Sequence, residues 1–421
     1  MNHPFSRLKI AVVHDWLPLY GGAERILEQV LVVLPNADIF SIIDGLDPNQ
    51  RGFIQGKPVN TSFIQRLPRG RTKYRFYLAL MPLAIEQFDL SSYDVIISNS
   101  YAVAKGVITG PDQLHLCICC SPIRYAWDLQ HQYLQRGDLH RGVKSWIARL
   151  VLHYVRMWDV RTANGVDQFA AISNFVARRI LKAYRRDSIT LYPPVDVARF
   201  SVVAEKEDFY LAASRMVPYK RIDLIVEVFT EMQDKRLIVI GDGPEFAKIK
   251  KKAGKNVTFL GYQDSNVLRD HLQRARAFVF AAEEDFGILP VEAQACGTPV
   301  IAFGRGGAIE TIIDGQTGVL FGDQTLSSLQ NAIMRFERIA NDLNCYTIRA
   351  NAERFGIERF RDEFQKLLKT CLTEHPAPRF HLARHDAETA SRHVRRRGGD
   401  LQKRGKDDSE AEDELLYGSK V

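Results

Sequence analysis

Two glutamates, Glu284 and Glu292, stand eight positions apart and are the residues whose type and spacing point most directly to chemistry. The apolar run at residues 278–280 predicts a short buried strand before them. Residues 291–296 predict a helix that ends at Gly297. Because ligands of open α/β sheets bind outside the carboxyl ends of the strands, we expect both carboxylates to face one crevice. By themselves they suggest paired acid–base catalysis, although the helix dipole alone also explains a glutamate early in a helix.

A pair of cations follows another predicted strand, at residues 209–213. Arg215 and Lys220 would leave the end of this strand and point into the crevice that holds Glu284. Arginine offers a planar fork and lysine a compact charge, so together they can neutralise a diphosphate leaving group. For an isolated arginine–lysine pair, a solvated surface is the better explanation.

Two glycine-rich turns also follow predicted strands. Gly21 and Gly22 link the strand at residues 9–14 to a helix, so backbone N–H groups and a helix N-terminus could face an anion. Gly241 and Gly243 follow the strand at residues 237–240. Both pairs could also serve only as tight turns.

These segments belong to two series in which strand-like and helix-like stretches alternate, which predicts parallel sheets covered by helices. The prolines near residues 192–196 interrupt the alternation and indicate a linker between two domains. We expect domains at residues 1–198 and 199–355, and an amphipathic helix at residues 356–374. The charged stretch at residues 375–421 has few large apolar residues and is expected to be disordered.

Taken together, the segment EEDFGILPVEAQACGTP, the two glycine turns and the Arg215–Lys220 segment resemble the retaining glycosyltransferases of family 4. The resemblance covers roughly residues 8 to 372. It implies the GT-B fold, in which two doubly wound Rossmann-like domains face a central cleft, with the last helix crossing back to the first domain.

The resemblance also implies roles for individual residues. Glu284 would contact hydroxyls of the donor sugar, Glu292 the nucleotide ribose, and Arg215 and Lys220 the diphosphate. We take Arg215, Lys220 and Glu284 as the catalytic candidates. The donor-binding candidates share a place at the predicted crevice and are Gly21, Gly22, Gly241, Gly243, Gly287, Ile288, Leu289 and Glu292.

The acceptor is expected on the first domain. The segment from Cys119 to Asp128 resembles the His-Thr/Ser-Pro-x-Arg-Tyr-x-Trp-Asp stretch of many members, but Cys120 stands at the position of the family histidine. A thiol does not offer the charge switch of an imidazole. Same-face transfer needs no protein base, because the leaving phosphate can take the acceptor proton. The acceptor-side candidates are Asp15, Cys120, Ser121 and Arg124, where Asp15 is expected to face the cleft with His14.

The composition narrows the classes of partner. The chain has 421 residues, 46% of them hydrophobic, and a formal net charge of +7, which suits anionic partners. No nucleic-acid-binding motif is present, so nucleic acid is disfavoured. The sequence shows no signal-peptide pattern, and the six cysteines fit reduced thiols in a cytoplasmic protein. No metal site or cofactor is expected.

A basic, partly apolar segment at residues 139–161, with Arg69, Arg71, Lys73 and Arg75, could contact anionic lipid at the inner face of the plasma membrane. A surface helix packed on the sheet explains the segment equally well.

The function expected from these features is retaining, metal-independent transfer of a hexose in cell-surface polysaccharide biosynthesis. The donor would be a nucleotide-sugar, with GDP-mannose first and a UDP-sugar as the alternative. The acceptor would be a glycan, either free or linked to polyprenyl diphosphate. Two alternatives stay open, which are a non-catalytic partner protein that binds nucleotide-sugar and another GT-B enzyme such as an epimerase.

Overall fold

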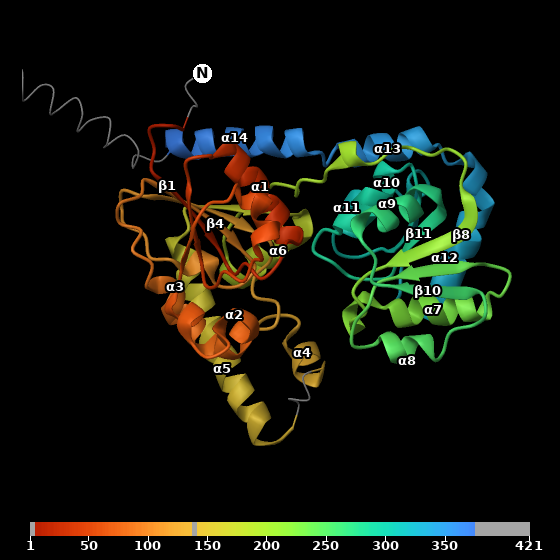
Figure 1. Ribbon diagram of the computed structural model, residues 1–421, viewed down its shortest axis with the longest axis horizontal. Helices are drawn as coiled ribbons and strands as arrows, with labels where there is room; N and C mark the ends of the chain where they lie inside the picture. Colours follow the sequence, from red (N-terminus) through yellow and green to blue (C-terminus); the bar gives the residue numbers. More distant parts are fainter. Residues whose placement is uncertain (1–4, 137–140, 375–421) are drawn as a thin grey trace, which may run out of the picture.

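The computed structural model describes residues 5–136 and 141–374 and contains two parallel sheets, each covered by helices (Figure 1). The α/β architecture with two doubly wound domains, expected from the alternating pattern, is therefore confirmed. The charged tail expected at residues 375–421 lies outside the described residues. Within the described ranges, every helix is too short or too polar to span a bilayer.

The first domain is built on a seven-stranded sheet with the order β3-β2-β1-β4-β5-β6-β7. Its strands are β1 (Ile10–His14), β2 (Asp38–Ser41), β3 (Val59–Thr61), β4 (Val95–Ser100), β5 (Leu114–Cys119), β6 (Gln168–Ala171) and β7 (Ile189–Thr190). Its α-helices are α1 (Gly22–Val33), α2 (Gly70–Lys73), α3 (Met81–Glu86), α4 (Gln130–Arg136), α5 (Gly142–Thr162) and α6 (Asn174–Tyr184).

The second domain is built on a six-stranded sheet with the order β10-β9-β8-β11-β12-β13. Its strands are β8 (Glu207–Ala213), β9 (Leu237–Ile240), β10 (Val257–Gly261), β11 (Ala275–Phe280), β12 (Val300–Phe303) and β13 (Gly318–Phe321). Its helices are α7 (Ile222–Glu231), α8 (Phe246–Lys250), α9 (Ser265–Arg274), α10 (Ile288–Ala295), α11 (Ala308–Thr311), α12 (Leu326–Ile339) and α13 (Cys345–Glu353).

The central strands are buried on both faces, which is why they appear in the sequence as continuous apolar runs. All residues of β1, β4 and β5 are buried, and so are those of β9 and β12. The paired strands of each sheet run parallel, so their carboxyl ends meet at one edge. This edge is where a doubly wound fold places its ligands.

The chain returns to the first domain at its last described helix, α14 (Ile357–Glu374), which lies along the top of that domain in Figure 1. Phe360, Phe364 and Leu368 are fully buried under it. Arg361 Nε donates to Gln29 Oε1 of α1 at 2.9 Å. The helix therefore ties the two ends of the described chain together through an apolar face and a hydrogen bond.

One helix is shorter than its periodicity predicts. The helical spacing of apolar residues at 75–88 predicts a single helix, but the structure has a 3₁₀ helix, η3 (Tyr74–Leu80), followed by α3. Tyr77 leaves the helical conformation, and Pro82 stands in the first turn of α3. Because proline has no N–H group to donate, it starts a helix more readily than it continues one.

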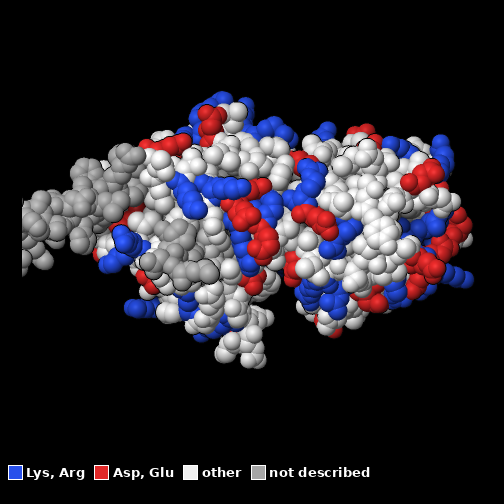
Figure 2. Space-filling view, turned by 90° about the horizontal axis from the view of Figure 1, so that it is seen from above, with Lys and Arg blue, Asp and Glu red and all other residues white. Residues whose placement is uncertain are grey.

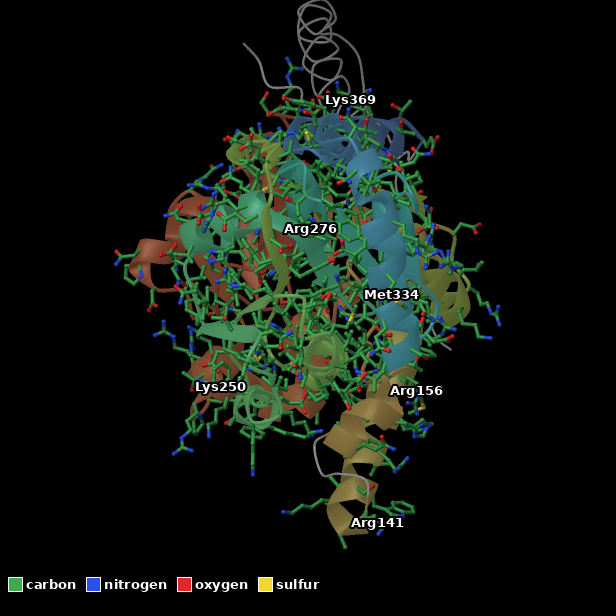
Figure 3. The ribbon with its side chains drawn as sticks, turned by 90° about the vertical axis from the view of Figure 1, so that its right-hand side faces the viewer. Arg141, Arg156, Lys250, Arg276, Met334 and Lys369 are labelled. Carbon is green, nitrogen blue, oxygen red and sulfur yellow. The ribbon has the colours of Figure 1, made fainter. Side chains whose placement is uncertain are left out.

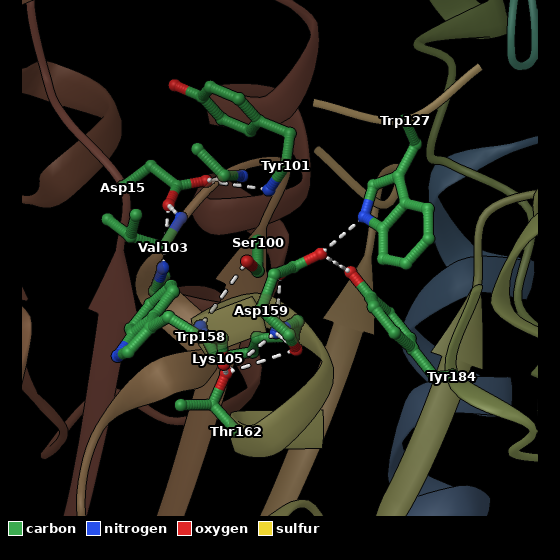
Figure 4. Close-up of polar contacts among 12 residues, drawn as sticks. Asp15, Ser100, Tyr101, Val103, Lys105, Trp127, Trp158, Asp159, Thr162 and Tyr184 are labelled. Carbon is green, nitrogen blue, oxygen red and sulfur yellow. Dashed lines mark hydrogen bonds and ion pairs between the residues drawn. The ribbon is translucent and has the colours of Figure 1, made fainter. Parts of the chain in front are cut away.

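The expectation that Asp15 faces the cleft is wrong, because its carboxylate is buried against backbone N–H groups of its own domain. The residue is fully buried, as is His14. Its Oδ2 accepts from the N–H groups of Tyr101 and Ala102, and its Oδ1 from those of Val103 and Ala104, at 2.6 to 2.9 Å (Figure 4). Because β1 lies beside β4, the carboxylate meets the loop that leaves β4 and binds its amides. Asp15 is therefore a structural residue.

A second buried carboxylate, that of Asp159 in α5, holds the outer part of the domain together (Figure 4). Its Oδ1 pairs with Lys105 Nζ at 2.7 Å, and its Oδ2 accepts from Trp127 Nε1 at 2.7 Å and Tyr184 Oη at 2.9 Å. The pKa of Tyr184 lies well above its usual range, mainly because the residue is buried and also because of the charge of Asp159. Its hydroxyl therefore keeps its proton and donates. The carboxylate of Asp159 thus joins α5 to the loop that carries Trp127.

Replacing Asp15 with alanine should lower the free energy of unfolding by about 3 kcal/mol or more, because four buried N–H groups lose their acceptor. Asp15→Asn keeps one acceptor oxygen and should lie between alanine and wild type. Urea unfolding followed by circular dichroism measures the change, with the exposed carboxylate variant Asp112→Ala as the control. Equal midpoints for Asp15→Ala and Asp112→Ala would contradict this role.

Candidate active site at the domain junction

The candidate residues lie beside the point where the strand order of each sheet reverses. In the first sheet this point falls between β1 and β4, and in the second between β8 and β11. The loop after β1 carries Gly21, the loop after β8 carries Arg215, and the loop after β11 carries Glu284. Such switch points are the usual ligand sites of doubly wound sheets. The topology therefore places these three loops at the carboxyl ends of strands that lie beside the two switch points.

The two glutamates occupy the local structures that the sequence predicts. Glu284 lies in the loop after β11, and Glu292 lies within α10, which ends just before Gly297. Gly287 precedes the helix in a left-handed conformation, with φ of +89°. A side chain at this position would strain the backbone, so the glycine permits the abrupt turn from loop to helix.

Two glycines that sequence reasoning missed support the Glu284 loop. Gly307 N donates to Glu284 O at 2.8 Å. A Cβ atom on Gly306 would lie 2.2 Å from Glu284 O, a contact that no side chain can make. The pair follows β12, so a Gly-Gly sequence after a predicted strand was the available signal. These glycines allow the neighbouring loop to hold the backbone of Glu284 in place.

Two helix N-termini meet where the domains approach each other. A Cβ atom on Gly22, at the start of α1, would lie 3.4 Å from Cδ1 of Ile288, at the start of α10. Neither helix start is capped by a side-chain hydrogen bond. The first N–H groups of a helix have no partner within it and carry partial positive charge. The two ends together provide a site suited to an anion.

Glycines also shape the loop that carries Arg215 and Lys220. A Cβ atom on Gly241 would lie 1.9 Å from Ser214 O, and one on Gly243 would lie 2.5 Å from Met216 O. Met216 N donates to Asp242 O at 2.8 Å. The two glycines therefore allow backbone-to-backbone packing that orients the segment after β8.

The two cations of this segment have different surroundings. Arg215 is exposed, and its guanidinium makes no ion pair with the described residues. Lys220 ends a short 3₁₀ helix, η7 (Pro218–Lys220), and its Nζ contacts the carboxylate of Glu284. Burial, and after it the positive charge of Arg124, lower the pKa of Lys220 from 10.5 to about 8. Lys220 and Glu284, predicted separately, are thus direct neighbours.

Asp285 joins the two domains and was missed by the sequence analysis. Its Oδ2 pairs with Arg124 Nη2 at 2.6 Å and its Oδ1 with Arg179 Nη1 at 2.5 Å, both from the first domain. Its backbone oxygen accepts from Ser173 Oγ at 2.6 Å. Charge-assisted pairs of this length are strong when they are shielded from water. The only sequence signal was an acidic residue directly after Glu284.

Glu292 is also engaged across the junction. Arg25 Nη1 of α1 donates to Glu292 Oε1 at 2.6 Å, and the carboxylate is largely buried. Arg25 was not a candidate, because nothing in its local sequence distinguishes it from an ordinary surface arginine. The pair places the start of α1 beside the middle of α10.

A third cross-domain contact caps α6. The carboxylate of Glu310 accepts from the N–H groups of Asn174 and Phe175, at 2.8 Å each. Ser173 supplies the usual side-chain cap to Val176 N at 3.1 Å. A carboxylate at a helix N-terminus is favourable because it meets both unpaired donors and the positive end of the dipole. Charged side chains of both signs gather across the middle of the molecule in the view from above (Figure 2).

Cys120, the departure from the family pattern, lies in a buried chain of hydrogen bonds. Its Sγ donates to Asn99 Oδ1 at 3.3 Å. Asn99 Nδ2 lies 3.2 Å from His14 Nδ1, and His14 Nε2 lies 3.1 Å from Glu24 Oε1. Because the amide NH₂ only donates, the contact puts the imidazole proton on Nε2. Burial, followed by the charge of Asp15, raises the pKa of Cys120 well above its usual range, so the thiol stays protonated.

Two further candidates, Ser121 and Leu289, differ in their exposure. Ser121 is buried, and Arg179 Nη1 lies 3.4 Å from its Oγ. Leu289 is half-buried beside Ile288 in the first turn of α10. Within residues 5–136 and 141–374, no group of three or more His, Cys, Asp or Glu side chains is arranged to hold a metal ion.

The family-model match lies almost entirely within the second domain. Residues 196–353 match the family model described as "Glycosyl transferases group 1". A GDP-mannose-dependent alpha-(1-6)-phosphatidylinositol monomannoside mannosyltransferase of Mycolicibacterium smegmatis is 26% identical over 204 residues, which are 41% of this chain and 53% of the relative. The chain thus spans about half the length of this relative. The alpha-1,3/1,6-mannosyltransferase ALG2 of Candida glabrata is 22% identical, over 74% of this chain and 80% of that protein.

Solved structures match both domains. Sucrose-phosphate synthase of Thermosynechococcus elongatus has a TM-score of 0.66 at 19% identity, over 87% of this chain and 100% of that chain. The Anabaena protein Alr3699/HepE, solved with UDP-glucose, has a TM-score of 0.62 at 18% identity, over 86% and 99%.

Over residues 196–353 the second domain therefore resembles the group 1 glycosyl transferases. The whole chain has the GT-B fold of the glycosyltransferases of family 4 and resembles that family.

Proposed function

We propose that this chain is a retaining glycosyltransferase that moves a hexose from a nucleotide-sugar to a glycan or a lipid-linked acceptor. One observation supports this function above the others. The uncapped N-termini of α1 and α10 meet at the junction, and Lys220 contacts Glu284 in the loop that leads into α10. Helix N–H groups and a buried ammonium are suited to the diphosphate of a nucleotide-sugar.

The proposed catalysis rests on the leaving group. As the bond between sugar and phosphate lengthens, negative charge grows on the diphosphate. Lys220, Arg215 and the N–H groups at Gly22 would stabilise this charge more strongly in the transition state than in the bound donor. Because these groups are already in place, they need little rearrangement during the reaction.

Glu284 and Glu292 would recognise the donor sugar and the ribose. In the structure each carboxylate already holds a cation, Lys220 in one case and Arg25 in the other. Donor binding would therefore exchange these partners, with Lys220 turning to the phosphate and Glu284 to sugar hydroxyls. Carboxylates bind hydroxyl groups well because they accept up to four hydrogen bonds.

The buried thiol of Cys120 supports a mechanism without a protein base at this position. Its raised pKa keeps it neutral, and Asn99 already accepts its proton. We propose that the leaving phosphate takes the acceptor proton on the same face of the sugar, so that the anomeric configuration is retained. In this proposal the reaction uses neither a metal ion nor a further cofactor.

Mannose from GDP-mannose is the proposed donor, since the names of the relatives from Mycolicibacterium smegmatis and Candida glabrata both specify mannosyl transfer. A UDP-sugar is the alternative, because the Anabaena protein was solved with UDP-glucose. We propose a polyprenyl-diphosphate-linked glycan as the acceptor, in the cytoplasm, at the membrane where polysaccharide is assembled. All six cysteines are free, which suits a reducing compartment.

The experiment that tests this function is a mass-spectrometric transfer assay with GDP-, UDP- and ADP-sugars and polyprenyl-diphosphate-linked glycans. Transfer from one donor, with retained configuration by NMR, supports the proposal. Tight donor binding without any transfer would instead favour a non-catalytic partner protein, the candidate that the Cys120 departure favours.

Lys220→Ala should lower kcat by about 100-fold or more, because a preplaced cation no longer meets the charge that develops on the diphosphate. Steady-state kinetics measure the loss, and circular dichroism checks that the variant is folded. Lys248→Ala, an exposed lysine of the same domain, is the matched control. Normal turnover of Lys220→Ala would show that the diphosphate lies elsewhere.

The pH dependence of kcat/KM for the donor should reflect Lys220 in the free enzyme. Because the pKa of Lys220 is lowered to about 8, raising the pH through this value removes its charge and weakens donor capture. Above that pH, kcat/KM should fall by about tenfold per pH unit. In Lys220→Arg the guanidinium stays charged, so the fall should vanish below pH of about 11. A profile unchanged by Lys220→Arg would refute this assignment.

A further inference from the structure

Helix α5 extends beyond the body of the first domain. It runs for 21 residues, which corresponds to about 31 Å. Figures 1 and 3 show its N-terminal half projecting from the molecule, with Arg141 at the far tip and Arg156 where the helix reaches the body. The buried apolar residues Leu152, Val155 and Trp158 all lie from the middle of the helix onward, and in the projecting half Ser145 alone among the described residues is buried. The projecting half therefore buries no apolar side chain of its own.

The projecting half presents large apolar side chains to solvent. Trp146 is 77% exposed, Ile147 58% and Leu150 62%. The apolar positions recur at helical spacing along one stripe, which consists of Val143, Ile147, Leu150, Tyr154 and Met157. An isolated exposed apolar residue is ordinary, but a continuous patch marks an interaction surface.

A second apolar group lies on the element packed beside α5. Phe76, which is 81% exposed, is followed by Leu80 and Leu83 at intervals of four and three residues. These residues belong to η3 and α3, and η3 contacts α5. The exposed apolar surface is therefore built from two segments that are distant in the sequence.

The charges within the two segments have one sign, and the acidic residues that follow them, Glu86 and Asp159, are each paired with a cation. Residues 69–85 and 141–158 contain no aspartate or glutamate. Their basic residues, most of them exposed, are Arg69, Arg71, Lys73, Arg75, Arg141, Lys144, Arg149 and Arg156. A basic rim around exposed tryptophan, leucine and phenylalanine is typical of helices that lie in the interface of an anionic bilayer.

We propose that the projecting half of α5, together with η3 and the start of α3, is a docking face for an anionic lipid bilayer. The apolar stripe enters the headgroup region, and the surrounding lysines and arginines contact lipid phosphates. Charge complementarity favours this occupant over a second copy of the chain. A twofold contact sets the same patch against itself, and here it would oppose basic side chains to basic side chains.

The same helix also holds the proposed acceptor segment. Arg156 Nη1 donates to Ala126 O at 2.7 Å and contacts Gln130 Oε1 of α4. Trp127 Nε1 donates to Asp159 Oδ2 at 2.7 Å. Docking through α5 would thus place residues 124–130 near the bilayer surface. The benefit of this placement, a short path from the bilayer to the site for a lipid-linked acceptor, rests on the proposed function. The docking itself does not rest on the proposed function.

Flotation with lipid vesicles tests the docking face. Wild type should float with vesicles of mixed phosphatidylglycerol and phosphatidylcholine and should bind pure phosphatidylcholine weakly. Ile147→Glu/Leu150→Glu should weaken binding to the anionic vesicles by about tenfold or more, since two charges replace apolar anchors. The matched control is Leu181→Glu/Ile189→Glu, which makes the same charge change at exposed apolar positions of the same domain. Equal flotation of these two variants would overturn the proposal.

The basic rim is tested separately. Lys144→Gln/Arg149→Gln should weaken binding by about fivefold per removed charge, and the wild-type affinity should fall as salt is raised. Binding that is indifferent to salt and to both substitutions would refute the anionic-surface proposal.

Trp146 provides a direct reporter, because Trp16 and Trp158 are buried and Trp127 is half-buried. Anionic vesicles should shift the tryptophan emission of wild type to shorter wavelength and protect it from iodide. Trp146→Phe should lose most of this shift while it still floats. An unchanged shift in Trp146→Phe would place the contact elsewhere and contradict the proposal.

Two further measurements separate the alternatives. Lys220→Ala should float like wild type, so that a failed transfer assay leaves the docking result intact, and failed flotation leaves the transferase proposal intact. Light scattering without lipid should show the same mass for wild type and Ile147→Glu/Leu150→Glu. A larger mass for wild type that the substitutions abolish, without vesicle binding, would identify a second copy as the occupant and overturn the proposal.

Discussion

The arrangement of the candidate site depends on one buried carboxylate. Asp285 belongs to the second domain, and its two oxygens bind Arg124 and Arg179 of the first. A buried carboxylate without a partner is costly, so the domains gain stability by staying where both guanidinium groups reach it. The adjacent Glu284 contacts Lys220 of its own domain. The charge of Arg124, from the first domain, acts on Lys220, so a change in domain placement would alter the electrostatics of this pair as well.

Apart from Arg215, the candidate charged residues at the junction already have a charged or hydrogen-bonding partner. Arg25 holds Glu292, Lys220 holds Glu284, and Glu310 caps α6. An anionic ligand would therefore exchange partners with existing pairs and would not enter an array of unpaired charges. The helix N-termini at Gly22 and Ile288 differ in this respect, because no side chain caps them. Because no side chain of the described residues binds their N–H groups, these helix N-termini are the groups most available to an anion.

Helix α5 connects a surface feature to the candidate acceptor region. Its second half is anchored by the Asp159–Lys105 pair, which also receives Trp127. Its first half exposes the apolar stripe and carries the basic residues. One rigid helix thus joins the part of the chain suited to an anionic interface with the segment that carries Arg124. Burial at one end and exposure at the other follow from the position of the helix beyond the edge of the domain.

The sequence by itself determined the alternating elements, the two-domain α/β architecture, the segment after a strand that carries Arg215 and Lys220, the loop that carries Glu284 and the helix that carries Glu292. These features follow from local periodicity and from residues that start or end elements, which are encoded within short stretches. Periodicity failed only locally, at residues 74–86, where Pro82 starts a new helix. Local periodicity also did not predict that Asp15 would be buried by the loop after β4, because that loop begins at Tyr101, 86 positions later in the chain.

Only the tertiary structure decided which charges pair. Arg25 and Glu292 are 267 positions apart, and Arg179 and Asp285 are 106 positions apart. Ion pairing depends on distance in space and on exclusion of water, and neither quantity is written in the local pattern of residues. For the same reason the exposure of the α5 stripe could not be told from the sequence, where a packed helix and an interfacial helix look alike.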